Sequence, residues 1–101
     1  RGERGLTYAD ALPPGSTLSG KVHAKLRRMV ARVIGRVDAA ERSSIKFRVR
    51  HARHGVKVCK GIVRTVMAAE AVGNCTGAVC DEVRNMATIA SGAIQPLTIK
   101  P

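Results

Sequence analysis

STLSGKVHAKLRRMVARVIGRV, residues 16–37, is the stretch that decides how the rest of the chain is interpreted. Its apolar residues recur every three or four positions, so at about 100° per residue they fall on one side of a helix. This side consists of Val22, Leu26, Met29, Val30, Val33 and Val37, with Ile34 at its edge. The pattern predicts an amphipathic helix that follows the breaker Pro13-Pro14-Gly15 and that Ser16 or Ser19 can cap.

Basic residues gather on the flank beside this apolar side. They are Lys21, Lys25, Arg28, Arg32 and Arg36. Like charges at this spacing destabilise a helix by about 0.2–0.5 kcal/mol per pair. Burial of the apolar side must therefore stabilise the helix. The flank is either an ordinary solvated helix face or a surface that attracts anions.

The composition predicts one domain, residues 1–101, with residues 1–5 flexible. Hydrophobic residues make up 45% of the chain, which is enough for a core. Tyr8 and Phe47 are the only aromatic residues, so we expect an aliphatic core.

The net charge is +11, from 18 basic and 7 acidic residues. Residues 1–60 hold 15 lysines and arginines against 4 acidic residues, whereas residues 61–101 hold 3 of each. The net charge therefore lies in the first part of the chain. Such a field attracts polyanions: nucleic acid, anionic lipid or acidic cell-wall polymer.

Residues 44–51 alternate between apolar and basic side chains. Ile45, Phe47 and Val49 alternate with Lys46, Arg48 and Arg50. This period of two predicts a strand with one apolar face and one basic face. Residues 51–55 then form a hairpin loop that ends at Gly55, and residues 56–60 return as the partner strand.

The remaining segments complete an α+β prediction. Residues 6–9 are a candidate short strand. Residues 61–73 fit either a helix or a strand that continues the hairpin past a bulge at Gly61, and strand is favoured up to about Met67. Residues 76–91 predict a second helix, and residues 94–100 an edge strand. The order predicts a split β-α-β (ferredoxin-like) sandwich: a four-stranded antiparallel sheet with two helices on one face.

The three cysteines Cys59, Cys75 and Cys80 allow one disulfide in three ways. A bond between Cys59 and Cys75 would link the sheet to the second helix. A bond between Cys75 and Cys80 requires Cys75 to lie outside that helix, because positions five apart on a helix diverge by about 140°. Three reduced thiols in a cytosolic protein are the alternative. Zinc binding with His54 as fourth ligand is not expected, since the gaps differ from the usual ligand spacing.

The sequence carries no catalytic motif and no cofactor motif. His51 and His54 share the predicted loop with basic residues, but no carboxylate is placed to orient either imidazole. Residues 73–77, GNCTG, lack the lysine of a phosphate-binding loop. We therefore expect a protein that is not an enzyme and that binds no metal or cofactor.

Several features indicate a secreted, processed chain. It begins Arg1-Gly2-Glu3-Arg4 without a methionine, contains the glycosylation sequon Asn74-Cys75-Thr76 and has three cysteines. In size, charge and predicted element order, the chain resembles the small processed killer toxins of fungi and their viruses. The resemblance implies secretion, maturation from a precursor, and damage to sensitive fungal cells at the membrane or an ion channel.

The predicted function is that of a small secreted basic effector acting on an anionic cell-surface or membrane component of a target cell. The alternative is a basic protein that binds the RNA backbone, because the predicted sheet lacks aromatic residues on its basic face for base stacking. A spare cysteine or a free sheet edge would allow a homo-oligomer. The predicted binding residues are Lys21, Lys25, Arg28, Arg32, Lys46, Arg48 and Arg50.

Overall fold

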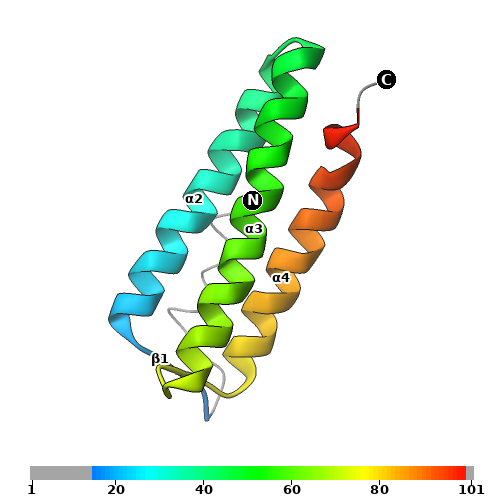
Figure 1. The fold of residues 1–101 in the computed structure, drawn as a ribbon. Coiled ribbons are helices and arrows are strands. Elements are labelled where there is room, and N and C mark those ends of the chain that lie inside the picture. Colours follow the sequence, from blue (N-terminus) through cyan, green and yellow to red (C-terminus); the bar gives the residue numbers. More distant parts are fainter. Residues whose placement is uncertain (1–14, 100–101) are drawn as a thin grey trace.

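Three long helices make up most of the computed structural model, which describes residues 15–99 (Figure 1). Helix α2 spans Gly20–Arg42, α3 spans Ile45–Ala71, and α4 spans Ala78–Ile94. A short 3₁₀ helix, η2, follows at Gln95–Thr98. The predicted four-stranded sandwich is therefore wrong, and the described chain is an antiparallel three-helix bundle.

Helix α2 confirms the helix predicted from residues 16–37. It starts after Ser19, whose hydroxyl oxygen accepts a hydrogen bond from the Val22 backbone N–H at 3.2 Å. This bond satisfies one of the amide groups left free at a helix start. The predicted apolar side faces the core, where Leu26 and Val30 are buried. The helix runs five residues past the predicted end.

Helix α3 replaces the predicted hairpin of residues 44–60. The alternation at its start is local: Ile45 and Phe47 are 50% and 47% exposed, and only Val49 is buried. A longer pattern at three- and four-residue spacing decides the structure instead, because it buries one side of a helix along its whole length. Its buried members are Val49, Ala52, Val56, Cys59, Ile62, Val66 and Ala69.

Gly55 lies inside α3 and not in a hairpin loop. A methyl group added to it would lie 3.6 Å from Ile94 Cδ1 and 3.8 Å from Arg36 Cβ. These distances show that α2 and the end of α4 both approach α3 closely at this residue. Gly61, predicted as a bulge that would let the sheet continue, is likewise helical. The predicted strand up to Met67 is wrong as well, because this segment continues the buried helical pattern of α3.

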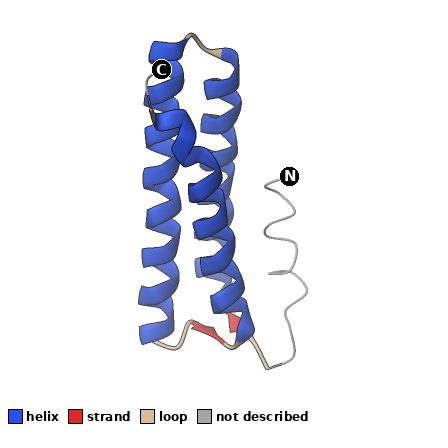
Figure 2. Cartoon of the chain, turned by 90° about the vertical axis from the view of Figure 1, so that its right-hand side faces the viewer, coloured by secondary structure: helices blue, strands red, loops and turns tan. Residues whose placement is uncertain are grey.

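The only sheet within residues 15–99 is a pair of two-residue strands. Strand β1, Thr17–Leu18, pairs antiparallel with β2, Cys75–Thr76. The Ser19 backbone N–H extends this contact by donating to the Asn74 carbonyl at 2.9 Å. Figure 2 shows the two strands at one end of the bundle, where α3 leads into α4. They fix the start of α2 against the start of α4.

The second predicted helix is confirmed as α4, which begins two residues later and ends three residues later than expected. The predicted final strand at residues 94–100 is wrong over its described part. Ile94 is the last residue of α4, and Pro96 lies in η2. The predicted strand at residues 6–9 and the flexible residues 1–5 lie outside the described residues.

Helix α3 is central, with α2 on one side of it and α4 on the other (Figure 1). Apolar side chains from all three helices meet in one core, whose largest fully buried members include Leu26, Ile62, Val66, Val79 and Val83. The outer sides of α2 and α3 are left to solvent, and they carry the candidate site.

Candidate functional site: a basic face on the helical hairpin

The outer side of α3 carries a stripe of basic residues with a spacing of four, three, four, three and four. Its members are Lys46, Arg50, Arg53, Lys57, Lys60 and Arg64, all exposed. This spacing places them along one side of the helix, away from the buried stripe. From Lys46 to Arg64 the stripe is about 27 Å long at the α-helical rise.

The flank of α2 supplies the second set of cations. Lys21, Lys25, Arg28 and Arg32 are exposed, as the sequence predicts. Arg36, one turn beyond Arg32, is half-buried because it faces α3. One of its guanidinium nitrogens, Nη1, lies 3.0 Å from His51 Nδ1. Arginine carries no acceptor, so Arg36 donates this bond and His51 accepts it.

His54 shows that the two sets meet. Its pKa lies below the ordinary value of 6.5, first because burial disfavours the charged ring. The next causes are positive charges on both helices: Arg36 and Arg32 on α2, then Lys57 on α3, with His51 last. The cations of α2 and α3 therefore lie on the same side of the seam between the helices.

We define the basic face as the basic stripe of α3 together with the basic flank of α2. It consists of Lys21, Lys25, Arg28, Arg32, Arg36, Lys46, Arg50, Arg53, Lys57, Lys60 and Arg64. Residues 20–37 and 45–69 contain no aspartate or glutamate. No carboxylate within these two segments neutralises the face.

Arg48 is the predicted site residue that does not join the basic face. It is half-buried, and its Nε donates to the Ala40 carbonyl oxygen at 3.4 Å across the connection between α2 and α3. Arg50 does join, with its guanidinium carbon 5.6 Å from the centre of the Phe47 ring. Arg53, Lys57, Lys60 and Arg64 are not among the predicted binding residues, although their four-three-four spacing is present in the sequence.

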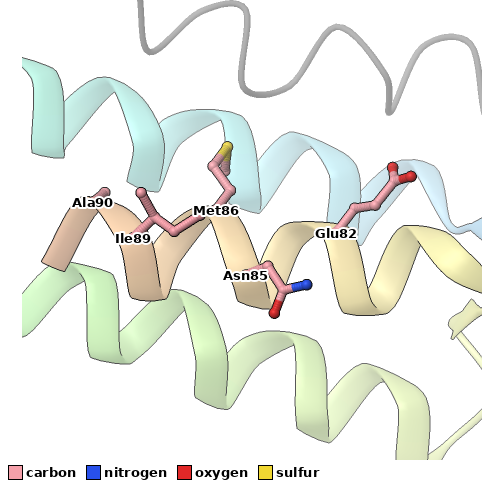
Figure 3. Close-up of a pocket in the computed structure, with 5 residues that line it drawn as sticks. All are labelled: Glu82, Asn85, Met86, Ile89 and Ala90. Carbon is pink, nitrogen blue, oxygen red and sulfur yellow. The ribbon is translucent and has the colours of Figure 1, made fainter. Parts of the chain in front are cut away.

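Helix α4 is electrostatically different. Its one basic residue, Arg84, forms ion pairs with Glu70 at the end of α3 and with Asp81 one turn earlier in α4. The exposed side of α4 carries a shallow groove lined by Glu82, Asn85, Met86, Ile89 and Ala90 (Figure 3). This surface offers no unneutralised cation to a polyanion.

The three cysteines are buried, each at 1% exposure. The Sγ atoms of Cys75 and Cys80 are 2.7 Å apart. Cys59 lies in α3, about 15 Å along the helix from Ala69. Ala69, by contrast, is close to Cys75, because its carbonyl accepts a hydrogen bond from the N–H of Asn74, the residue before Cys75. The structure brings Cys75 and Cys80 together and leaves Cys59 apart.

Burial raises the pKa of Cys59, and burial followed by the hydrogen bond with Cys75 raises the pKa of Cys80 to about 12. These groups stay protonated in the folded protein, which makes them poor nucleophiles. No group of three potential metal ligands occurs among residues 15–99.

Other predicted features receive no support as functional sites. His51 and His54 lie among cations, and within residues 15–99 no hydrogen bond or ion pair joins either ring to a carboxylate. The two predicted routes to a homo-oligomer find no support either, because Cys59 is buried and the four-stranded sheet is absent. Asn74 is exposed in the turn before β2, and its glycosylation stays a prediction.

Comparison with known proteins yields no family: no family model, no curated protein and no solved structure matches this chain. Between residues 15 and 99, no helix has the length and apolarity needed to cross a membrane. The basic face is therefore the feature of residues 15–99 from which we infer a function.

Proposed function

We propose that this protein binds nucleic acid through the phosphate backbone, using the basic face. The observation that supports this most strongly is a contact between the two helices: Arg36 Nη1 of α2 lies 3.0 Å from His51 Nδ1 of α3. One turn further along α3, His54 lies in the field of Arg32 and Arg36 on α2 and of Lys57 on α3. Two rows of cations thus form one surface. A polyanion that lies along the seam can contact both rows.

The length and charge of the face match a nucleic-acid strand. Phosphates of B-DNA are about 3.4 Å apart along each strand, so about 27 Å of stripe extends past roughly eight phosphates. Each phosphate neutralised by lysine or arginine releases condensed counterions, and this release drives the association. The proposed contact is with the backbone.

Sequence-independent binding is proposed because the face lacks groups that read bases. The one described aromatic residue, Phe47, lies at the hairpin end of α3, beneath the Arg50 guanidinium. Stacking of successive bases on aromatic rings, as in single-strand-binding proteins, has no basis in the described residues. Duplex DNA and duplex RNA are therefore expected to bind with similar affinity.

A secreted cationic effector is the second candidate. The exposed sequon residue Asn74 and the adjacent thiols of Cys75 and Cys80 favour it, since disulfides and glycosylation belong to secreted proteins. The element order that contributed to the killer-toxin resemblance is not the order in the structure. On this candidate, the basic face would bind an anionic component of the target-cell surface.

Fluorescence anisotropy of labelled duplexes of about 20 base pairs tests the first candidate. At about 50 mM salt we expect binding of both DNA and RNA, and a plot of log affinity against log salt with a slope of about −5 or steeper. Six or more phosphate contacts would produce that slope. Absence of binding, or a slope shallower than about −2, would contradict the proposal.

Vesicles with and without anionic lipid distinguish the second candidate in the same buffer. Nucleic-acid binding without vesicle binding supports the proposal. Binding to anionic vesicles alone would replace it with the effector candidate. The comparison uses the same protein preparation, so misfolded material cannot explain a difference between the ligands.

A further inference from the structure

The geometry points to a disulfide bond between Cys75 and Cys80, with Cys59 remaining a free thiol. The two Sγ atoms lie 2.7 Å apart, closer than two unbonded sulfur atoms usually approach. A small rotation of either side chain would bring them to the bonding distance of about 2.05 Å. This inference concerns a covalent modification and does not depend on the proposed function.

The backbone explains why residues five positions apart can meet. Cys75 lies in β2, outside the helix, whereas Cys80 is in the first turn of α4. Between them the chain turns at Gly77, whose φ of +85° suits glycine. The turn brings Cys75 back over the start of α4. Within one helix the two side chains would point in different directions.

Close packing at this end leaves little freedom for any other arrangement. The ordinary Cβ position at Gly77 would fall 2.8 Å from both the Gly15 carbonyl oxygen and Ser16 Cα. The Ser16 hydroxyl oxygen accepts from the Val79 backbone N–H at 3.3 Å. The segments before α2 and α4 are thus held together around the sulfur pair, and a disulfide would fix that junction.

The oxidation requires an external disulfide, such as a small oxidised thiol or an oxidised dithiol carrier. One cysteine thiolate attacks the carrier disulfide, breaks its S–S bond, releases one carrier thiol and forms a mixed disulfide. The second cysteine thiolate then attacks the cysteine sulfur of the mixed disulfide and displaces the other carrier thiol. Two protons leave Cys75 and Cys80, and two electrons reduce the carrier. Both thiols are buried, so exchange takes place before the start of α4 packs or when it opens.

Peptide mapping tests the pairing directly. The protein is refolded with oxidised and reduced glutathione, alkylated under denaturing conditions and digested with trypsin. Cys75 and Cys80 share one tryptic peptide, residues 65–84, while Cys59 lies in the separate peptide 58–60. We expect an unalkylated 65–84 peptide, lighter than its dithiol form by the mass of two hydrogen atoms, and an alkylated 58–60 peptide.

Two results would overturn the inference: alkylation of all three cysteines after oxidation, or a cross-link that joins peptide 58–60 to another peptide. The mapping uses the wild-type chain, so it does not depend on whether a variant folds.

Thermal unfolding with and without reductant supplies a second test. Breaking a disulfide that closes so short a loop should lower the melting temperature by roughly 10 °C. We expect this shift in wild type and in the matched control Cys59→Ser, but not in the double variant Cys75→Ser/Cys80→Ser. An equal shift in the double variant, or no shift in wild type, would contradict a stabilising disulfide.

Discussion

The α2–α3 hairpin and helix α4 share one core but differ sharply in charge. Residues 20–37 and 45–69 contain 13 lysines and arginines and no acidic residue. Helix α4 contains one arginine and two acidic residues, and the arginine is held in ion pairs. The same kind of apolar stripe positions all three helices, so the difference lies entirely on the outer surfaces.

The fold of the hairpin and its proposed function have different physical origins. Like charges three and four residues apart oppose helix formation, so the basic face weakens the hairpin while the shared core stabilises it. The charge therefore does not explain the fold. The proposed function depends instead on the charge, because among the described residues the hairpin carries the positive field that would attract a polyanion.

The largest expected effect comes from removing cations at the seam. In Arg32→Gln/Lys57→Gln, one charge is lost from each helix, and both residues are exposed. We expect duplex affinity at about 100 mM salt to fall by roughly 10- to 100-fold and the salt slope to become shallower by about 2. Anisotropy titrations at several salt concentrations measure both quantities.

The matched control changes the net charge equally on the other surface. Asn85→Asp/Gln95→Glu lowers it by two units at exposed positions of α4 and η2, with almost no change of shape. We expect a much smaller change in affinity. Equal losses in the two double variants would show that net charge matters and that the basic face has no special role.

The next effect concerns the junction between the hairpin and α4. Gly77→Ala places a side chain at a φ of +85° and against backbone atoms of Gly15 and Ser16. We expect a loss of about 1–3 kcal/mol in the free energy of unfolding, measured by urea denaturation. Gly73→Ala is the control: its φ is +79°, but no atom lies within 4 Å of the added carbon. A larger loss at Gly73 would contradict the close packing described here.

A smaller effect, of opposite sign, tests the interior of α3. Gly55→Ala adds a methyl group in ordinary contact with Ile94 and Arg36, so the gain in helix propensity should stabilise the protein by about 0.5–1 kcal/mol. If Gly55 instead ended a hairpin loop at positive φ, the same substitution would destabilise the protein. Urea denaturation gives the sign. Gly35→Ala, in open space on α2, is expected to stabilise by a similar amount.

The smallest effect is a pH dependence at His54, which faces Arg32 and Arg36 of α2 and Lys57 and His51 of α3. Its pKa in the folded protein is lowered, so the unfolded chain takes up the proton first as the pH falls below 6.5. The stability due to neutral His54 is present above that pH and is lost as the pH falls through the folded-state pKa.

His54→Gln should therefore show a weaker loss of stability between about pH 7 and pH 5 than wild type. Urea denaturation across this range measures the difference, and comparison of the two proteins removes the shared contribution of the other histidines. A steeper loss in the variant would mean that neither burial nor the cations of the two helices lower the pKa of His54.

The sequence predicted two of the three helices because their apolar residues follow a helical spacing and no strand-like alternation overlaps it. In α2, the predicted stripe that includes Leu26 and Val30 faces the core. In α3, six alternating residues at the start and two glycines imitated a strand, a turn and a bulge. The three- and four-residue spacing from Val49 to Ala69 is a stronger signal than this alternation, since one helix buries all of its members on the same side.

The candidate site was predicted for α2 and only partly for α3, and the error followed from the fold. A strand places Lys46, Arg48 and Arg50 on one face, whereas a helix separates Arg48 from the other two. The helix instead aligns Lys46 and Arg50 with Arg53 and the cations beyond it. Whether the two basic surfaces met could not be predicted, because that depends on how α2 and α3 pack.

Mapping of backbone amide chemical shifts during titration with duplex DNA tests the central claim most directly. The account predicts that the largest shifts fall in residues 21–36 of α2 and 46–64 of α3, and that the exposed side of α4 changes little. Shifts concentrated on α4, or spread evenly over all three helices, would contradict a binding surface formed by the basic face.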